Sequence, residues 1–476
     1  MSIGSTTGID ILGMNLMLRR ALYLSFFLIF FAVIAWLLLY LQGFRYNPAK
    51  HKLERTGAIM VDSAPSGATI VLNGAIQATE TTATIQPLKP GDYETIVNLP
   101  GFQTWRKILN VKPSRVTFTG RIRLWPPPST GDSISGTALT TSSLAPNGEN
   151  ILYYSNTGLS SGLSLFNLAS GKVNLLSRPS NSTVLTTEWS PDSHEILISE
   201  NSSTGVTWRI FNLEYGAWEQ LALPTSTKPT AIRWGSNSSS LYLSTINELY
   251  QWNRRGRNLK LLWRETMVDF RVHDGLIFGL TRQLNGVLNL KILNQSNLQL
   301  VPLEDQPTLS TNVVFLEARE AWLPLFDQDR HTLYLLHSPL TELKPVRRLP
   351  EVVKLDWSTD GNQLLLANNF EIWEYRIEED RLNLLLRVSS PLVRARAYGQ
   401  EPYLIYASNQ EVWALELDTR NEQQRWLLAK YDSEIDDFFL DPVGRTLNVK
   451  TRNGLYRLGL IPQPTPVGGE LLKDSL

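Results

Sequence analysis

The sequence predicts an all-β protein behind a single N-terminal transmembrane helix, with a small β-sandwich first and a C-terminal β-propeller after it. Three features support this fold class. Residues 21–41 carry no charge, turn residues recur about every ten positions as far as residue 124, and a longer pattern then repeats about every 40–45 residues. Short strands at these spacings are typical of β-sandwiches and of propeller blades. We expect eight blades, with seven as the alternative.

The predicted parts follow one another along the chain. They are a cytoplasmic N-terminus (1–20), a transmembrane helix (21–42), a juxtamembrane linker (43–56), the sandwich (57–124), a Pro-rich linker (125–132), the propeller (133–461) and a flexible C-terminal tail (462–476).

Charge and cysteine content exclude several classes of function. Lys and Arg together number 45, as do Asp and Glu, so the formal net charge is zero. A balanced chain offers no basic field for nucleic acid, and we expect no nucleic-acid partner. The absence of cysteine excludes disulfides, a cysteine nucleophile, thiolate zinc sites and a lipoprotein-type anchor.

The apolar run of residues 21–41 predicts a membrane anchor. As a helix it would be about 32 Å long, which matches a hydrocarbon core of about 30 Å. Arg19 and Arg20 precede the run, and Tyr40 and Phe44 place aromatic rings at its other end. A cleaved signal peptide is the alternative, but the apolar core is too long and no small-x-small cleavage site follows Leu41.

Charge alone leaves the orientation of this helix open. Two arginines flank its N-terminal side, whereas Arg45, Lys50, Lys52 and Arg55 follow its C-terminal side. A count of Lys and Arg therefore favours a cytoplasmic propeller, although long domains can be translocated regardless of local charge.

Residues 63–74, SAPSGATIVLNG, predict a β-hairpin directly after the linker. Pro65-Ser66-Gly67 is a turn sequence, and Thr69 to Val71 are β-branched. Asn73-Gly74 is the strongest two-residue signal for a hairpin turn.

Several motifs in this region resemble the PEGA domain, a small β-sandwich of prokaryotic surface proteins. They are Pro65-Ser66-Gly67-Ala68, Leu72-Asn73-Gly74, Pro90-Gly91-Asp92-Tyr93 and Pro100-Gly101-Phe102-x-x-Trp105, with Ser66 in place of the usual Glu. The resemblance implies a non-catalytic, exported spacer or adhesion module. On this basis we expect residues 1–20 inside the cell and residues 43–476 outside.

Beyond the linker, which begins Trp125-Pro126-Pro127-Pro128, one pattern recurs. A turn sequence precedes an apolar run in at least five places, at Pro146-Asn147-Gly148, Trp189-Ser190-Pro191-Asp192, Trp234-Gly235-Ser236-Asn237, Trp357-Ser358-Thr359-Asp360-Gly361 and Asp441-Pro442-Val443-Gly444. The units resemble TolB-type and WD-like repeats, although the Gly-His and Trp-Asp signatures of true WD repeats are missing. Together with the anchor and the PEGA motifs, they resemble a bacterial membrane-anchored surface protein.

The last repeat predicts how the ring closes. It contains only three strands, because Pro462, Pro464 and Pro466 prevent a regular fourth. Residues 133–141 precede the first full repeat and belong to no unit of their own. We expect this segment to supply the missing outer strand.

The sequence predicts no catalytic residue, no metal site and no cofactor. Residues 131–136 resemble a hydrolase serine motif, but Ser135 stands where the motif needs glycine. His331 and His337 are six residues apart on one strand, about 20 Å, which is too far to share a metal ion.

Six residues are candidate contacts for a ligand or partner. Trp189, Trp234 and Trp357 share one repeat position, and Trp373 and Trp413 share another, so these five are predicted to belong to the core. Tryptophans on outer-strand positions are expected to be more exposed, and a group of acidic residues precedes the last repeat. The candidates are therefore Trp218, Trp263, Trp426, Asp432, Glu434 and Asp436.

The leading hypothesis is a non-enzymatic, membrane-anchored protein in which a PEGA stalk presents a propeller that binds an envelope protein or a cell-wall glycan. A propeller-based glycan hydrolase or lyase is one alternative, and a TolB-type envelope assembly factor is another. The membrane contact itself is assigned to residues 21–42.

Overall fold

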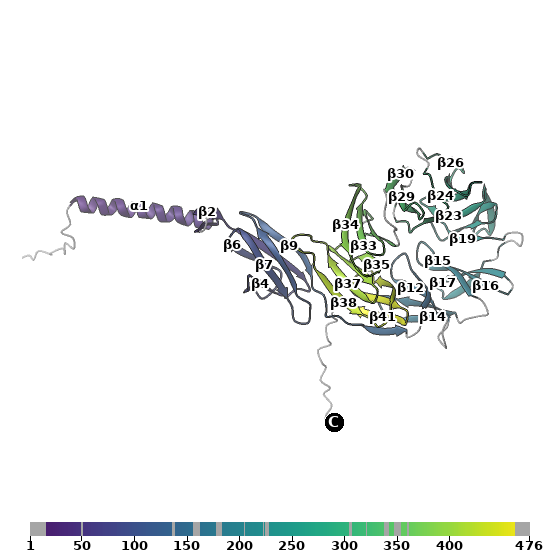
Figure 1. Cartoon of the computed structure of the whole chain (residues 1–476), viewed down its shortest axis with the longest axis horizontal. Coiled ribbons are helices and arrows are strands. Elements are labelled where there is room, and N and C mark those ends of the chain that lie inside the picture. The colour runs from purple at the N-terminus through teal and green to yellow at the C-terminus, as the bar shows by residue number, and fades with distance from the viewer. Residues whose placement is uncertain are drawn as a thin grey trace, which may run out of the picture. The chain divides into compact units, whose positions relative to one another are not determined.

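The computed structural model describes residues 16–48, 51–135, 139–155, 162–177, 183–203, 205–221, 223, 228–303, 307–319, 321–337, 342–346, 354–358 and 361–461. Residues 1–15 and the predicted tail, 462–476, lie outside the described residues. The chain divides into two compact units. The first contains residues 1–124 and the short segment 420–422, and the second contains residues 125–419 and 423–476. Figure 1 shows a single helix at the start and strands throughout the rest.

Helix α1 (Leu16–Leu41) begins five residues before the predicted span. Its portion from Arg20 to Leu41 is long and apolar enough to cross a membrane, and its side chains are exposed along this length. Trp36 and Tyr40 stack on each other near its end, with ring centroids 5.4 Å apart. Exposed apolar side chains around the whole circumference are expected of a helix that lies in lipid.

The segment predicted to be a linker, residues 43–56, contains a hairpin instead. Strand β1 (Phe44–Asn47) pairs antiparallel with β2 (Lys52–Arg55). Phe44 and Tyr46 alternate with polar residues along β1, and Leu53 lies opposite Tyr46 in β2, so the apolar side chains of the two strands share one face.

The sandwich consists of two sheets. One has the order β6-β3-β9 and the other β5-β4-β7-β8. The strands are β3 (Gly57–Ala64), β4 (Thr69–Leu72), β5 (Ala75–Ala78), β6 (Ala83–Leu88), β7 (Gly91–Asn98), β8 (Trp105–Val111) and β9 (Val116–Arg123).

The predicted Asn73-Gly74 hairpin is confirmed. Both residues have positive φ, 48° and 82°, and Leu72 pairs with Ala75 across the turn. These angles are those of a type I′ turn, which matches the twist of the two strands. Along β8, Trp105, Leu109 and Val111 alternate with exposed residues and fill the core between the sheets.

The second unit consists of four-stranded antiparallel sheets, eight in the described residues. The first four contain β11 (Leu139–Leu144), β12 (Asn150–Ser155), β13 (Gly162–Asn167) and β14 (Val173–Ser177); β15 (Thr183–Trp189), β16 (Glu195–Ser202), β17 (Gly205–Asn212) and β18 (Ala217–Gln220); β19 (Ala231–Trp234), β20 (Ser240–Ser244), β21 (Glu248–Asn253) and β22 (Asn258–Arg264); β23 (Met267–His273), β24 (Leu276–Arg282), β25 (Leu288–Asn294) and β26 (Leu300–Val301).

The other four sheets continue the series. They contain β27 (Val313–Phe315), β28 (Trp322–Asp327), β29 (Thr332–His337) and β30 (Glu342–Val346); β31 (Lys354–Trp357), β32 (Gln363–Ala367), β33 (Glu371–Arg376) and β34 (Arg381–Arg387); β35 (Leu392–Ala397), β36 (Tyr403–Ser408), β37 (Glu411–Glu416) and β38 (Arg425–Lys430); and β39 (Ile435–Leu440), β40 (Thr446–Thr451) and β41 (Gly454–Gly459), together with β10 (Asp132–Ser135).

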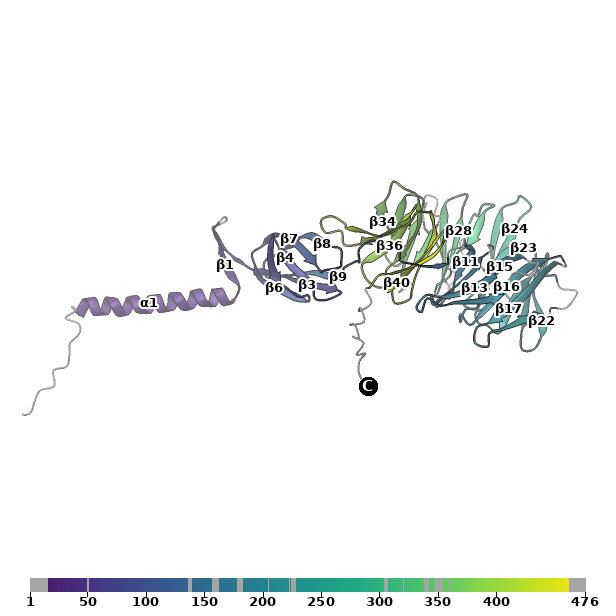
Figure 2. The same ribbon diagram turned by 90° about the horizontal axis from the view of Figure 1, so that it is seen from below.

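Consecutive sheets pack face to face. The first strand of a sheet, meaning the one that comes first in the sequence, approaches the first strands of the neighbouring sheets, as β15, β19 and β23 do. The sheet that ends the chain packs on the first one, where Phe439 and Leu455 meet Ile151 and Phe166. The second unit is therefore a β-propeller whose first strands surround the axis, and Figure 2 shows the sheets in their succession.

The predicted closing strand is present but shorter than expected. β10 pairs antiparallel with β41, Asp132 opposite Arg457 and Ser133 opposite Tyr456. Residues 136–138 lie outside the described part of the chain, and residues 139–141 belong to β11 in the first sheet. The segment before the first sheet thus completes the last one and covers its outer edge.

Candidate functional site

Charged side chains on the first strands line the axis of the propeller. Glu188, Arg233 and Asp356 each directly precede one of the repeat tryptophans, and Arg394 and Arg396 occupy β35. Acidic and basic residues of this kind face each other across neighbouring sheets. We use the name charged belt for eight first-strand residues: Glu188, Arg233, Asp269, Arg271, Asp356, Arg394, Arg396 and Asp437.

One half of the belt joins three sheets. Arg233 on β19 lies between two carboxylates, with its Nη1 3.3 Å from Glu188 Oε2 and its Nη2 3.1 Å from Asp269 Oδ1. The backbone N–H of Trp234 also donates to Glu188, at 3.2 Å. Arg271 adds a longer contact to Asp269, at 3.6 Å.

The other half joins β31, β35 and β39. Arg394 Nη1 donates to both carboxylate oxygens of Asp437, at 2.8 and 2.7 Å. Arg396 Nη1 makes one long contact with Asp356 Oδ1, at 3.4 Å. The guanidinium of Arg396 also lies 5.8 Å from the centre of the Phe439 ring.

Burial determines the direction of the pKa shift for some members of the belt, whereas Asp437 raises the pKa of Arg394 despite burial. Burial raises the pKa of Asp356, and the nearby guanidinium groups of Arg396 and Arg394 only partly offset this. Burial likewise raises the pKa of Glu188 despite Arg233, and it lowers the pKa of Arg396 despite Asp356. Desolvation of a charged group at the axis is therefore costly, and each group depends on its partner.

A pocket of about 580 Å³ opens next to the second half of the belt. Its wall combines Arg394, Arg396 and Asp356 with the turn Pro146–Gly148 and with exposed Glu317. The wall thus mixes charged groups from first strands with backbone from the turns that follow them.

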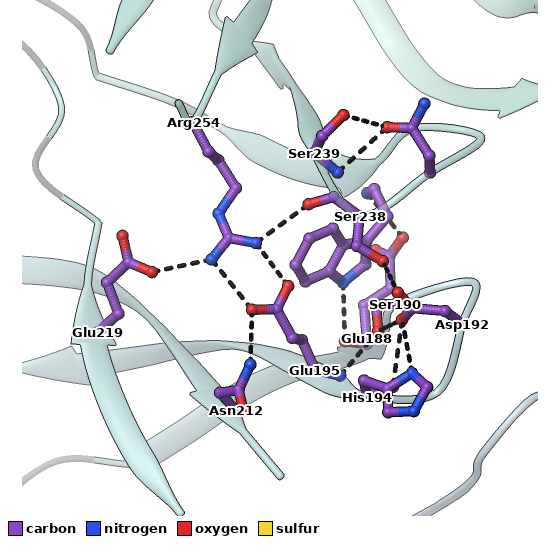
Figure 3. A network of polar contacts seen from close by, with 12 residues as sticks. Glu188, Ser190, Asp192, His194, Glu195, Asn212, Glu219, Ser238, Ser239 and Arg254 are labelled. Atoms are coloured by element: carbon purple, nitrogen blue, oxygen red, sulfur yellow. Dashed lines mark hydrogen bonds and ion pairs between the residues drawn. The ribbon is translucent and has the colours of Figure 1, made fainter. Parts of the chain in front are cut away.

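A second polar network joins the sheets that begin with β15 and β19 (Figure 3). Arg254 donates to both oxygens of Glu195, at 2.5 and 3.1 Å, and to Glu219, at 2.8 Å. The Arg254 guanidinium also lies 5.6 Å from the centre of the Trp234 ring. These charge-assisted hydrogen bonds connect the sheet that begins with β19, which carries Arg254, to the sheet that begins with β15, which carries both glutamates.

Asp192 forms the other end of the same network, in the turn between β15 and β16 (Figure 3). It accepts hydrogen bonds from the hydroxyls of Ser190, at 2.6 Å, and Ser238, at 2.5 Å, and from the backbone of His194. Burial raises the pKa of Asp192, but these hydrogen bonds outweigh it and lower the pKa. Every partner of Asp192 stabilises a turn, so we interpret this network as structural.

The candidate tryptophans have different surroundings. Trp218 is half-buried, lies under the Arg209 guanidinium at 4.5 Å and donates to the Leu176 carbonyl at 3.3 Å. Trp263 is half-buried beside Met267. The exposure expected for Trp426 is wrong: only 5% of it is accessible, and its ring lies 6.2 Å from that of Tyr403.

The candidate carboxylates do not converge. Glu434 pairs with Arg452, and Asp432 and Asp436 are exposed. Neighbouring Asp437 belongs to the charged belt. Within the described ranges, no group of three His, Asp or Glu side chains could hold a metal ion.

The repeat tryptophans Trp189, Trp234 and Trp357 are buried, as predicted. Each indole N–H donates to a residue in or just after the first strand of the preceding sheet. The acceptors are the Ser143 hydroxyl for Trp189, the Glu188 carbonyl for Trp234 and the Glu317 carbonyl for Trp357. Trp373 is half-buried against the core that contains Trp357, and Trp413 is half-buried against a separate core that includes Leu404 and Tyr406.

Sequence reasoning missed the charged belt, although a signal was present. Three of its pairs join opposite charges one repeat apart: Glu188 with Arg233 across 45 positions, Asp356 with Arg396 across 40, and Arg394 with Asp437 across 43. Comparing charges between equivalent repeat positions would have found them.

Comparisons with known structures returned β-propeller and other chains of low identity. The C-terminal WD40 domain of Sif2 is 14% identical with a TM-score of 0.48, covering 70% of this chain and 99% of that chain. The Dos1 propeller is 11% identical with a TM-score of 0.49, covering 70% and 95%. Kluyveromyces lactis Hsv2 is 10% identical with a TM-score of 0.40, covering 57% and 91%.

Comparisons of sequence bear on the first unit. No match was found among curated protein sequences. The family model of the PEGA domain matches residues 56–123, the stretch that forms the sandwich. The chain therefore carries a PEGA domain, followed by a β-propeller.

Proposed function

We propose that this chain is a single-pass membrane protein of the cell envelope, in which the PEGA domain holds the propeller outside the cytoplasm to bind an envelope protein or glycan. The observation that carries the binding role is the 580 Å³ pocket beside the charged belt. Pockets with a few converging polar groups are the usual binding sites of folded domains.

The pocket has hydrogen-bond donors to offer. In the described part of the chain, the hydrogen bonds of Arg394 and Arg396 use only Nη1, so the Nη2 group of each guanidinium remains as a donor. Carboxylates, backbone carbonyls and sugar hydroxyls are acceptors, which fits both a protein and a glycan ligand.

The apolar helix and the PEGA domain together support this proposed location. Residues 20–41 suit a membrane span, and PEGA domains are expected in exported proteins. We therefore place residues 1–20 inside the cell and residues 43–476 outside.

Cysteine labelling tests this topology, because the native chain has no cysteine. Ser239 is exposed, so a Ser239→Cys variant of the full chain should react with a membrane-impermeant maleimide on intact cells. A Ser5→Cys variant is the control and should react only after lysis. Labelling of Ser239→Cys only after lysis would place the propeller in the cytoplasm.

Site-specific photocrosslinking tests the pocket. Asn147 at its rim and Asn237 outside it are exposed and occupy the equivalent turn of two sheets. A benzophenone residue at position 147 of the full chain in its native membrane should give an adduct that position 237 does not. Mass spectrometry would identify the adduct as peptide or glycan, and equal adducts at both positions would contradict a binding pocket.

A further inference from the structure

Two residues, Gln42 and Gly43, separate the end of α1 from the β1–β2 hairpin. In Figure 2 the hairpin projects away from the axis of the helix. Arg45 connects it to the last turn of α1, because its Nη1 donates to the Tyr40 carbonyl at 2.9 Å. The Arg45 guanidinium also lies 3.5 Å from the centre of the Tyr40 ring. If α1 spans a bilayer, this hairpin is at the level of the lipid headgroups.

The two faces of the hairpin differ in chemistry. Tyr46 pairs directly with Leu53, and Phe44 with Arg55, so these four side chains share one face. Tyr46 and Leu53 are 56% and 55% exposed, which is unusual for neighbouring large apolar side chains in a strand pair. The Arg55 guanidinium lies 4.8 Å from the centre of the Phe44 ring.

The hairpin is also basic. Its two strands contain Arg45, Lys52 and Arg55 and one acidic residue, Glu54. Aromatic and aliphatic side chains next to Lys and Arg are the composition that binds membrane interfaces, because the rings enter the headgroup region while the cations reach lipid phosphates.

We propose that this hairpin docks on the membrane surface, with Tyr46 and Leu53 inserted among the headgroups of anionic phospholipids and with Arg55, on the same face, binding their phosphates. The inference rests on the proposed membrane anchoring. It gives the positive charges that follow α1 a role other than setting topology.

A fluorescent probe on the full chain in lipid nanodiscs tests this docking. A polarity-sensitive probe on Leu53→Cys should show blue-shifted emission and quenching by shallow spin-labelled lipids. Both effects should be stronger with anionic phosphatidylglycerol than with phosphatidylcholine alone. Adding Arg55→Gln should lower the ratio of docked to undocked hairpin about fivefold.

The same probe on Ser239→Cys is the control, because this exposed residue belongs to the propeller. If the chain enters nanodiscs but the probe at position 53 is quenched by aqueous iodide as strongly as the probe at position 239, the docking is wrong and the anchor stands. If the chain does not enter nanodiscs and washes from membranes in alkaline carbonate, the anchor itself is wrong.

Discussion

Replacing Asp437 with alanine is expected to lower the free energy of unfolding by about 3–5 kcal/mol, because it leaves Arg394 buried without its partner. The two side chains are only 19% and 17% exposed, and both carboxylate oxygens accept from the guanidinium. Chemical unfolding of the full chain in detergent, followed by tryptophan fluorescence, measures the loss.

Glu434→Ala is the matched control, since Glu434 lies three residues away but pairs with Arg452 at the surface, where the side chains are 49% and 66% exposed. This variant should change stability by less than about 1 kcal/mol. A double variant, Asp437→Leu with Arg394→Met, removes both charges and should recover most of the loss. Equal unfolding midpoints for Asp437→Ala and Glu434→Ala would contradict a structural role for the belt.

The sequence was sufficient to predict elements that depend on local chemistry or on repetition. Asn73-Gly74 specifies its turn because both residues tolerate positive φ. Trp189, Trp234 and Trp357 recur at one repeat position, and a position that recurs in every sheet faces the neighbouring sheet. The closing strand β10 could be predicted because the last repeat lacks a strand.

The charged belt could not be read from local sequence. Charged residues such as Glu188 and Arg394 are usually exposed when they alternate with apolar ones, and only the ring brings opposite charges together at the axis. Trp426 was misplaced for a related reason. Its outer-strand position predicts exposure, but an aromatic cluster that includes Tyr403 buries it.

That cluster contains Trp125, which the proline-rich sequence around it assigned to a linker. Trp125 is completely buried, and its ring makes edge contacts with Tyr398 and Tyr403, at 5.0 and 5.8 Å between centroids. Both tyrosines belong to the sheet of β35–β38 or to the turn within it. The first residue of the second unit is thus part of the propeller core.

Trp125→Ala is therefore expected to lower the free energy of unfolding of the propeller by about 3–5 kcal/mol, the usual cost of removing a fully buried tryptophan. Tyr215→Ala is the control, since Tyr215 is 76% exposed and its removal should leave stability nearly unchanged. Unfolding midpoints of the full chain in detergent, measured by circular dichroism, would compare the two variants. If Trp125→Ala and Tyr215→Ala unfold at the same midpoint as the native chain, Trp125 contributes no more than a linker residue, and the propeller core begins after the prolines.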